Sequence, residues 1–587
     1  MKRYSYLIVI MLLLITTVIS ESCKKEFLER PPLGALSPDV LATSSGINKL
    51  LIGAYAALDG QNLGSSTPWS GSVDNWIWGS VAGGDAHKGS DGTDQTPIDP
   101  IASWTVTPSN PMIFDKWKVT YAGIARVNSI FKVLPLVKGL SSDAAKNIDA
   151  QAHFLRGHYY FELKRMYNMV PWISDSTTDF KQPNNMDIWP KIEVDFKTAF
   201  DNLPETQSEV GRANKWAAGA YLATVYLYEK KYQEAKSLFD QIIAQGKTAT
   251  GVKYGLLPSL EDNFRPELET SSPEAVFPVE MAANVGTGTI ANATNGDMLN
   301  YPYGDSPFGC CGFFQPTVDL ANSYRTDANG LPYLDDYNQH PVKNDMGILS
   351  SASFTPDAGP LDPRIDWTIG RRGLPYLDWG IHPGQKWIRS QPFSGPYAPK
   401  KNIWWHATEQ FHDNNSWAPA TAINYLVIRF ADVLLMAAEA DAQLGNLDDA
   451  MALVNLVRNR AANKSGWVYK YEDNANPSGG FSNEPAADYQ IKPYTSFSSK
   501  DFALKAIYFE RKLELGMEGH RFFDLSRWGI AEKTMNSFYD FEGKITTDIS
   551  SGHFTTGKNE YFPIPQQEID LTTVNGKATL TQNQGYK

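Results

Sequence analysis

The chain has 587 residues, a formal net charge of −12 and a sequence pI of about 5.3. An acidic surface repels phosphate backbones, which argues against nucleic acid as a partner. Charged residues make up only 20% of the chain, which argues against disorder. Aromatic residues make up 12%, including 16 tryptophans, and are expected either in the core or on a stacking surface for a ligand.

The first 22 residues have the pattern of an export signal. Lys2 and Arg3 precede an apolar run of 13 residues, 7–19, which is shorter than the ~20 residues that a membrane-spanning helix needs. Small residues then lead to Cys23, which resembles the lipidated first residue of a bacterial lipoprotein. The alternative is an ordinary signal peptide with an incidental cysteine. Since no second run is long enough to span a bilayer, the mature chain is expected to sit on a membrane by its lipid.

The other two of the three cysteines, Cys310 and Cys311, are adjacent. Neighbouring Cα atoms lie about 3.8 Å apart across a trans peptide bond, below the usual disulfide range, so a bridge between them is expected to be strained. An exported protein of this size without a disulfide framework must be held together by its core.

Apolar residues at helical spacing predict several helical segments along the chain. These are residues 47–58, 117–136, 148–167, 216–244, 425–462 and 501–523. Two long loop systems, 59–112 and 261–425, are rich in tryptophan, and long loops in a compact protein are usually functional or disordered. The predicted organisation is a signal peptide (1–22), an N-terminal helical region (23–260) with a ligand loop (59–112), and a C-terminal region (261–587) that is loop-rich over 261–425 and helical over 426–587.

Residues 216–244 and 433–461 resemble each other in sequence pattern. In each segment one alanine follows another after twelve positions: Ala223 and Ala235, then Ala438 and Ala450. Small residues at these points let two antiparallel helices approach closely, and the spacing is that of a tetratricopeptide hairpin. We therefore predict a mainly all-α fold, a tetratricopeptide-containing helical body decorated by long irregular loops. Because the repeats are not tandem, a regular solenoid is not expected.

Several stretches resemble the SusD/RagB family. They are RFADVLLMAAE (429–439), VNLVRNR (454–460), ERKLELGMEGHRFFDLSRW (510–528), YFPIP (561–565) and QNQGY (582–586), with Ser22-Cys23, Phe27-Leu28 and residues 117–128 near the front. The resemblance implies a tetratricopeptide-containing lipoprotein of the outer membrane. It also implies a partner, a SusC-like TonB-dependent transporter over which the lipoprotein sits as a lid. The cargo that it implies is usually an oligosaccharide, although some members deliver peptides.

Glu510, Glu514 and Glu518 lie on one face of a predicted helix, with His520 nearby. Four basic residues are interleaved with them: Arg511, Lys512, Arg521 and Arg527. Carboxylates on one helix face do not flank a shared cleft, so structural ion pairs are expected here in place of acid–base catalysis. We predict no enzyme activity and no cofactor.

Two further groups of residues are weak candidates for a metal. His406, Glu409 and His412 do not share one helical face, and no zinc-protease signature is present. Asp85, Asp91 and Asp94 lack the alternation of a calcium-binding EF-hand loop. No metal site is therefore predicted.

The loop aromatics are the strongest functional signal. A sugar ring stacks its apolar C–H face on an aromatic ring, while its hydroxyl rim needs polar partners such as Asp, Asn and Arg. By loop location and residue type, the predicted glycan-binding residues of the first loop system are Trp76, Trp78, Asp85, Lys88 and Trp104. Those of the second are Tyr303, Cys310, Arg371, Trp379 and Arg389. The alternative for any one tryptophan is packing between loops, because tryptophan is mostly buried.

These observations predict a surface-exposed lipoprotein of the outer membrane that binds a glycan and delivers it to a SusC-like transporter. One alternative is peptide capture by the same fold, for which exposed strand edges or groups that read a backbone would be expected. A second is a glycoside hydrolase, which would need two carboxylates about 5–10 Å apart across an open cleft.

Overall fold

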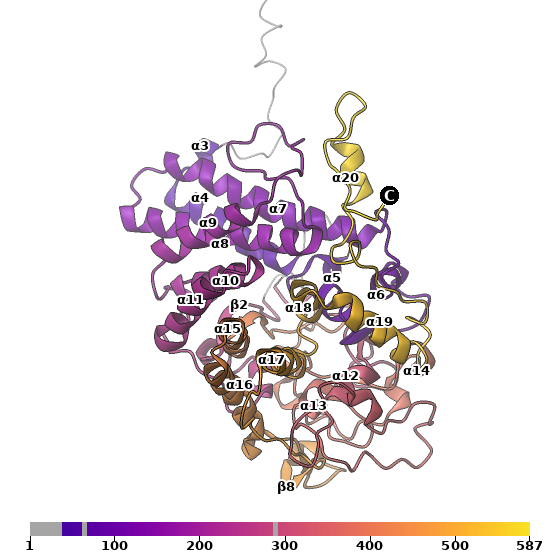
Figure 1. Ribbon diagram of the computed structural model, residues 1–587. Helices are drawn as coiled ribbons and strands as arrows, with labels where there is room; N and C mark the ends of the chain where they lie inside the picture. The colour runs from indigo at the N-terminus through magenta and orange to yellow at the C-terminus, as the bar shows by residue number, and fades with distance from the viewer. Residues whose placement is uncertain (1–37, 61–66, 286–291) are drawn as a thin grey trace, which may run out of the picture.

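The computed structural model describes residues 38–60, 67–285 and 292–587 (Figure 1). The predicted signal peptide, the lipidation site Cys23 and the Phe27-Leu28 motif lie outside these residues. Within the described part of the chain, no helix is both long and apolar enough to cross a membrane.

Helices dominate the fold, as predicted. In the first half they are α4 (Ser44–Ala56), α7 (Pro111–Val133), α8 (Ser142–Tyr167), α9 (Trp189–Asn202), α10 (Lys215–Tyr228) and α11 (Tyr232–Gln245). In the second half they are α15 (Phe430–Leu444), α16 (Leu447–Ala462), α17 (Lys500–Leu515), α18 (Arg521–Trp528), α19 (Ala531–Glu542) and α20 (Gln566–Leu571). Side-chain caps start several of them: Asn110 accepts from the amide of Met112 at α7, with Pro111 in the first turn, and Ser141 accepts from Ala144 at α8.

The two tetratricopeptide-type hairpins are present, as α10–α11 and α15–α16. All four alanines of the repeat pattern, Ala223, Ala235, Ala438 and Ala450, are fully buried. The second hairpin turns at Gly445, whose φ of 89° favours glycine. Helix α11 packs against α15, so the two hairpins stack although a long insert separates them in sequence (Figure 1).

The segment 67–112 is not an open loop, which corrects the expectation for this part of the chain. It contains α5 (Pro68–Gly71), a π-helical turn η2 (Trp76–Val81), strand β1 (Ala86–Gly89) and α6 (Asp99–Ala102). Nearly all of residues 69–90 are buried. Its glycines and serines allow close packing of backbone against backbone.

The predicted helix over 501–523 is two helices, because the chain breaks between Leu515 and Arg521. Gly519 has a φ of 76°, and a Cβ added at Gly79 would lie 1.7 Å from the carbonyl oxygen of Gly519. The break therefore results from direct backbone contact between this turn and η2, where neither chain leaves room for a side chain.

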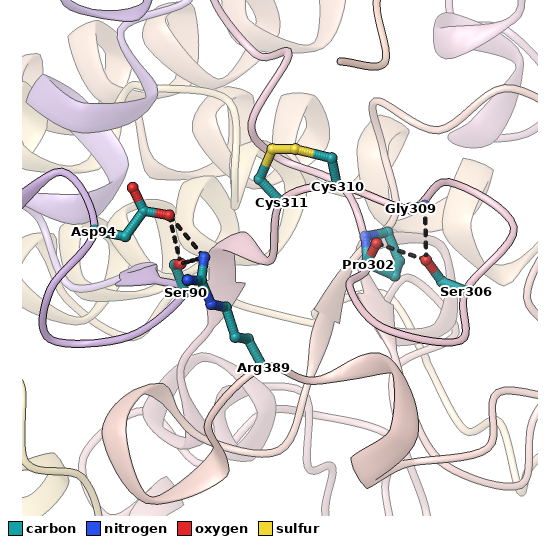
Figure 2. The surroundings of a disulfide bond; sticks show 8 residues. All are labelled: Ser90, Asp94, Pro302, Ser306, Gly309, Cys310, Cys311 and Arg389. Carbon is teal, nitrogen blue, oxygen red and sulfur yellow. Dashed lines mark hydrogen bonds and ion pairs between the residues drawn. A yellow bond between two sulfur atoms is a disulfide. The ribbon is translucent and has the colours of Figure 1, made fainter. Parts of the chain in front are cut away.

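Four two-stranded sheets occur among the described residues, and one of them positions the candidate site. Strand β1 pairs antiparallel with β3 (Phe313–Pro316), with Gly89 opposite Phe313 and Ala86 opposite Pro316. This pairing brings residues 86–90, in the middle of the first loop system, beside residues 309–312 of the second. The structure joins Cys310 and Cys311 by a disulfide, a bridge that the argument from Cα spacing disfavoured (Figure 2).

The carboxylates on α17 and in the turn after it form structural ion pairs, as expected, but with other partners. Glu510 contacts Arg364 and Arg458, and Glu514 contacts Arg364, Arg429 and Arg460. The interleaved cations turn elsewhere: Arg511 pairs with Asp432 and Asp524, and Lys512 with Asp319. Glu510 and Glu514 are buried in the core between helices, whereas Arg511, Asp432 and Asp524 line a pocket there and are neutralised by one another.

Candidate functional site

The three tryptophans predicted as ligand platforms in the first loop system are buried, which corrects that prediction. Each indole N–H donates to a backbone carbonyl: Trp76 to Gly296, Trp78 to Ser70 and Trp104 to Ala82, at 2.8, 2.8 and 3.0 Å. With their indole N–H groups satisfied, these buried side chains stabilise the core and lie off the outer surface, although Trp76 also lines a pocket among the helices.

Asp85 and Arg371 are also buried and are withdrawn from the predicted site. Burial raises the pKa of Asp85 to about 6, and the carboxylate accepts a hydrogen bond from the amide of Met517. Arg371 donates twice to Asp366, at 2.8 Å each; burial opposes its charge, but this carboxylate raises the pKa of the guanidinium above its ordinary value. Both side chains stabilise the interior.

Lys88 is fully buried. Its ammonium donates to the backbone carbonyls of Asp91 and Asp94, at 3.0 and 2.8 Å, and pairs with Asp99 at 2.8 Å. Lys88 therefore does not reach a ligand, which corrects that prediction. It does fix the loop that carries Asp91 and Asp94.

The neighbouring His87 is clamped between two carboxylates near the end of the chain. Its ring nitrogens lie 3.1 Å from Glu542 and 2.9 Å from Asp548. Glu542 also accepts from the amides of Val318 and Asp319, the first turn of the short helix α12 (Val318–Ser323). Burial alone would lower the pKa of His87, but the two carboxylates outweigh it and raise the pKa to about 10.

This clamp predicts a pH-dependent cost for His87→Gln. Below the ordinary pKa of 6.5 the ring is protonated in both folded and unfolded protein, so its ion pairs contribute fully to stability. Between 6.5 and about 10 only the folded state keeps the proton, so the contribution falls as the pH rises. Urea denaturation should therefore show the largest loss for His87→Gln near pH 6 and a small one near pH 10. Exposed His553→Gln is the control, and a pH-independent gap would contradict the expectation.

Four predicted residues, Tyr303, Cys310, Trp379 and Arg389, are half-buried, and contacts through Gly312 and Phe308 connect the segments that carry them. We call the surface that they form the loop face. Arg389 is its polar centre: its guanidinium contacts Asp94 and the hydroxyl of Ser90, each at 2.7 Å (Figure 2). It also contacts Asp91 at 2.8 Å. The same guanidinium lies over the ring of Tyr303, 5.0 Å from its centroid.

The disulfide segment packs directly against this centre. A Cβ added at Gly312 would lie 3.1 Å from Cβ of Tyr303 and 3.3 Å from Cβ of Arg389. The amide of Ser90 donates to the carbonyl of Gly312, which continues the β1–β3 ladder. Tyr303, Arg389 and the chain that carries the cysteines are thus one packed unit.

Trp379 extends the loop face as an aromatic row. Its ring lies 5.2 Å from Phe308 and 4.6 Å from His406, and its indole N–H donates to the carbonyl of Trp404 at 2.7 Å. Phe308 stands two positions before Cys310 and so links the row to the disulfide. With its N–H satisfied inside, the ring of Trp379 has only its apolar surface to present outside.

Sequence reasoning missed two aromatic residues of the second loop system. The sequence suggests His406 only as a weak metal ligand, but its ring packs against Trp379 at 4.6 Å. His412, the other histidine of that group, stacks on Trp404 at 4.6 Å. Trp417, in the second loop system, is not among the predicted residues, and it is 69% exposed. An exposed tryptophan cannot be told from a buried one by residue type; only the fold separates them.

Acidic side chains on the loop face are held by cations. Asp91 and Asp94 pair with Arg389, and Asp305 lies 3.4 Å from Lys386. Hydrogen bonds from the hydroxyl and amide of Thr93, with help from Arg389, hold the pKa of Asp91 below its ordinary value. An ionised, paired carboxylate suits hydrogen bonding to hydroxyl groups better than it suits proton donation.

Fold and site together define a helical protein with tetratricopeptide-type hairpins and a loop face of aromatic and charged side chains. The sequence matches the model of the SusD family over residues 273–586. Residues 26–227 match a second model, described as starch-binding associating with outer membrane. The chain belongs to the SusD family.

Relatives and solved structures cover almost the whole chain. SusD-like protein P25 of Formosa agariphila is 25% identical over 96% of this chain and 97% of its own length, and SusD-like protein P2 of the same organism is 22% identical over the full length of both chains.

A SusD superfamily protein of Bacteroides vulgatus superposes with a TM-score of 0.66 at 21% identity, over 92% of this chain and 99% of that one. Surface glycan-binding protein A of Bacteroides thetaiotaomicron, solved with laminarihexaose, superposes with a TM-score of 0.63 at 19% identity, over 92% and 99%. A laminarin-binding SusD-like protein is similar at a TM-score of 0.61 and 24% identity, over 93% and 100%.

Proposed function

We propose that this protein binds a glycan at the loop face and does not alter it chemically. The observation that supports the proposal most is the half-buried ring of Tyr303 lying against an arginine, Arg389, that two carboxylates hold in place. Rings offer planes for the C–H face of a sugar, and the guanidinium and carboxylates offer donors and acceptors for its hydroxyls. Two structural relatives are named for laminarin and laminarihexaose, which makes laminarin the first probe.

We further propose that Cys23 carries the lipid anchor, that the protein is exposed on the outer membrane, and that it passes its glycan to a SusC-like TonB-dependent transporter. The description of the second family model, which names association with the outer membrane, supports this location. Membrane fractionation of cells tests the anchor: Cys23→Ser should move the protein from the membrane to the soluble fraction. Copurification of a barrel transporter with the anchored protein tests the partnership.

Trp379→Ala is expected to weaken glycan binding about tenfold or more, which corresponds to losing an aromatic contact worth roughly 1.4 kcal/mol. Affinity gel electrophoresis with laminarin and a panel of other polysaccharides measures the effect. The matched control is Phe180→Ala, an aromatic residue that is 65% exposed. It adjoins Lys181, whose ammonium donates to the carbonyl of Thr573 just after α20.

The two alternative functions predict other results. Peptide capture would show heat of binding with oligopeptides and none with oligosaccharides in parallel calorimetry. A hydrolase would release reducing ends from the polysaccharide on incubation with purified protein. Equal gel retardation of Trp379→Ala and the unsubstituted protein would place the binding surface elsewhere.

A further inference from the structure

The Cys310–Cys311 disulfide lies at the surface of the loop face. Cys310 is half-buried and Cys311 is buried against the core. On one side Gly309 is exposed, and a Cβ added there would meet no atom within 4 Å. On the other side Gly312 packs against Tyr303 and Arg389. The bridge therefore sits between open space and the polar centre of the face (Figure 2).

This disulfide contributes little to the stability of the fold. A cross-link stabilises a protein mainly by restricting its unfolded chain, and the effect grows with the length of the loop that it closes. Here the two cysteines are one position apart, so the closed loop is the shortest possible. The surrounding turn is held by other bonds: the hydroxyl of Ser306 donates to the carbonyl of Pro302 at 2.7 Å, and the amide of Gly309 donates to that hydroxyl at 3.4 Å. The position of the bridge suggests a local role.

The chemistry of a disulfide suits that role. Two bonded sulfur atoms form a polarisable, uncharged surface with no hydrogen to donate, whereas two thiols are separate weak donors that rotate independently. The ring that closes through the two cysteines also restricts the side chains at their χ torsions. A fixed apolar patch beside Arg389 and the ring of Tyr303 matches the amphipathic pattern of a sugar ring, whose C–H face and hydroxyl rim need different partners.

We propose that the Cys310–Cys311 disulfide is itself a contact surface for the C–H face of a bound sugar, and that its reduction weakens glycan binding. The proposal deepens the proposed function and rests on it. Reduction by a dithiol breaks the S–S bond: the reductant supplies two electrons and two protons, two cysteine thiols form, and the reductant closes into its own disulfide. The fixed apolar patch formed by the two bonded sulfur atoms is then replaced by two thiols that rotate independently.

The experiment uses the full chain with Cys23→Ser, so that only Cys310 and Cys311 respond to the reductant. Binding to laminarin and the polysaccharide panel is measured by affinity gel and calorimetry before and after treatment with dithiothreitol, and thiols are counted by their reaction with a chromogenic disulfide. We expect no free thiol before treatment, two after it, and at least a tenfold loss of affinity on reduction. The midpoint of thermal unfolding is expected to stay unchanged.

The matched control is Cys310→Ser with Cys311→Ser, which should bind as weakly as the reduced protein and should not respond to dithiothreitol. If this variant folds poorly, the double alanine variant and the chemically reduced protein give the same comparison. Equal affinity in the oxidised and reduced states, or two free thiols in the untreated protein, overturns the inference while leaving the proposed function standing. If the oxidised protein binds no glycan of the panel, the proposed function fails and the inference fails with it.

Discussion

Arg429→Met is expected to lower the free energy of unfolding by about 3–5 kcal/mol, the cost of removing one partner from a buried ion pair. Arg429 is buried at the start of α15, 2.6 Å from Glu514, 2.9 Å from Glu274 and 2.8 Å from Glu518. Methionine fills similar space but leaves these carboxylates with fewer cations in a medium of low polarity. The shift of the urea denaturation midpoint at neutral pH measures the loss.

The pH dependence of this loss has a definite sign. Burial would raise the pKa of Glu518, but Arg429 and Lys401 outweigh it and lower the pKa to about 2. The contribution of that pair is therefore present above the ordinary pKa of 4.5 and is lost as the pH falls toward 2. The difference between Arg429→Met and the unsubstituted protein should narrow over that acidic range.

Lys505→Met is the control for Arg429→Met. Lys505 lies 2.8 Å from Asp335, but the two side chains are 48% and 74% exposed, so their ion pair is expected to contribute about 1 kcal/mol or less. If both variants unfolded at the same urea concentration, the buried network would not stabilise the fold as argued.

Trp104→Ala is expected to cost about 3–5 kcal/mol of stability, as for other large-to-small substitutions in cores. The indole stacks on Phe562, with ring centroids 4.8 Å apart at 22°, and meets Phe522 and Phe554 at 4.6 and 5.1 Å. Removing it leaves a cavity among three rings and deprives the carbonyl of Ala82 of its indole donor.

Trp417→Ala is the matched control for Trp104→Ala, because the same residue type is removed from a surface position. Its effect on the denaturation midpoint is expected to stay within about 0.5 kcal/mol. The two variants also test the correction made above. If Trp104→Ala kept its stability but lost glycan binding, the tryptophan would belong to the ligand site after all.

The helical body could be predicted from the sequence because its signals are local. Alanines twelve positions apart and runs at helical spacing identify both hairpins without knowledge of their partners. The break after Leu515 could not be found this way, because it depends on contact between Gly79 and Gly519, which lie far apart in the sequence. A glycine inside a helical pattern does not reveal which backbone approaches it.

The candidate site was predictable only in part, for the same reason. Trp76, Trp78 and Trp104 have the residue type and loop setting of a glycan platform, but distant segments cover them. A segment rich in glycine, serine and tryptophan has the same composition whether it lies on the surface or packs as a π-helical turn. The pairing of β1 with β3, which assembles the loop face, joins segments more than 200 residues apart and leaves no local trace.

Residues near the C-terminal end of the chain form hydrogen bonds with elements in its first third. Asn583 donates to the carbonyl of Tyr167, 416 positions earlier, Tyr539 donates to Ala102, 437 positions earlier, and His87 reaches across 455 positions to Glu542. The ribosome delivers the N-terminal end first, so the contact of α8 with Asn583 forms only after the C-terminal residues have been synthesised. Until then the surfaces around Tyr167, Ala102 and His87 lack these partners, so the incomplete chain is open to proteases and to premature association.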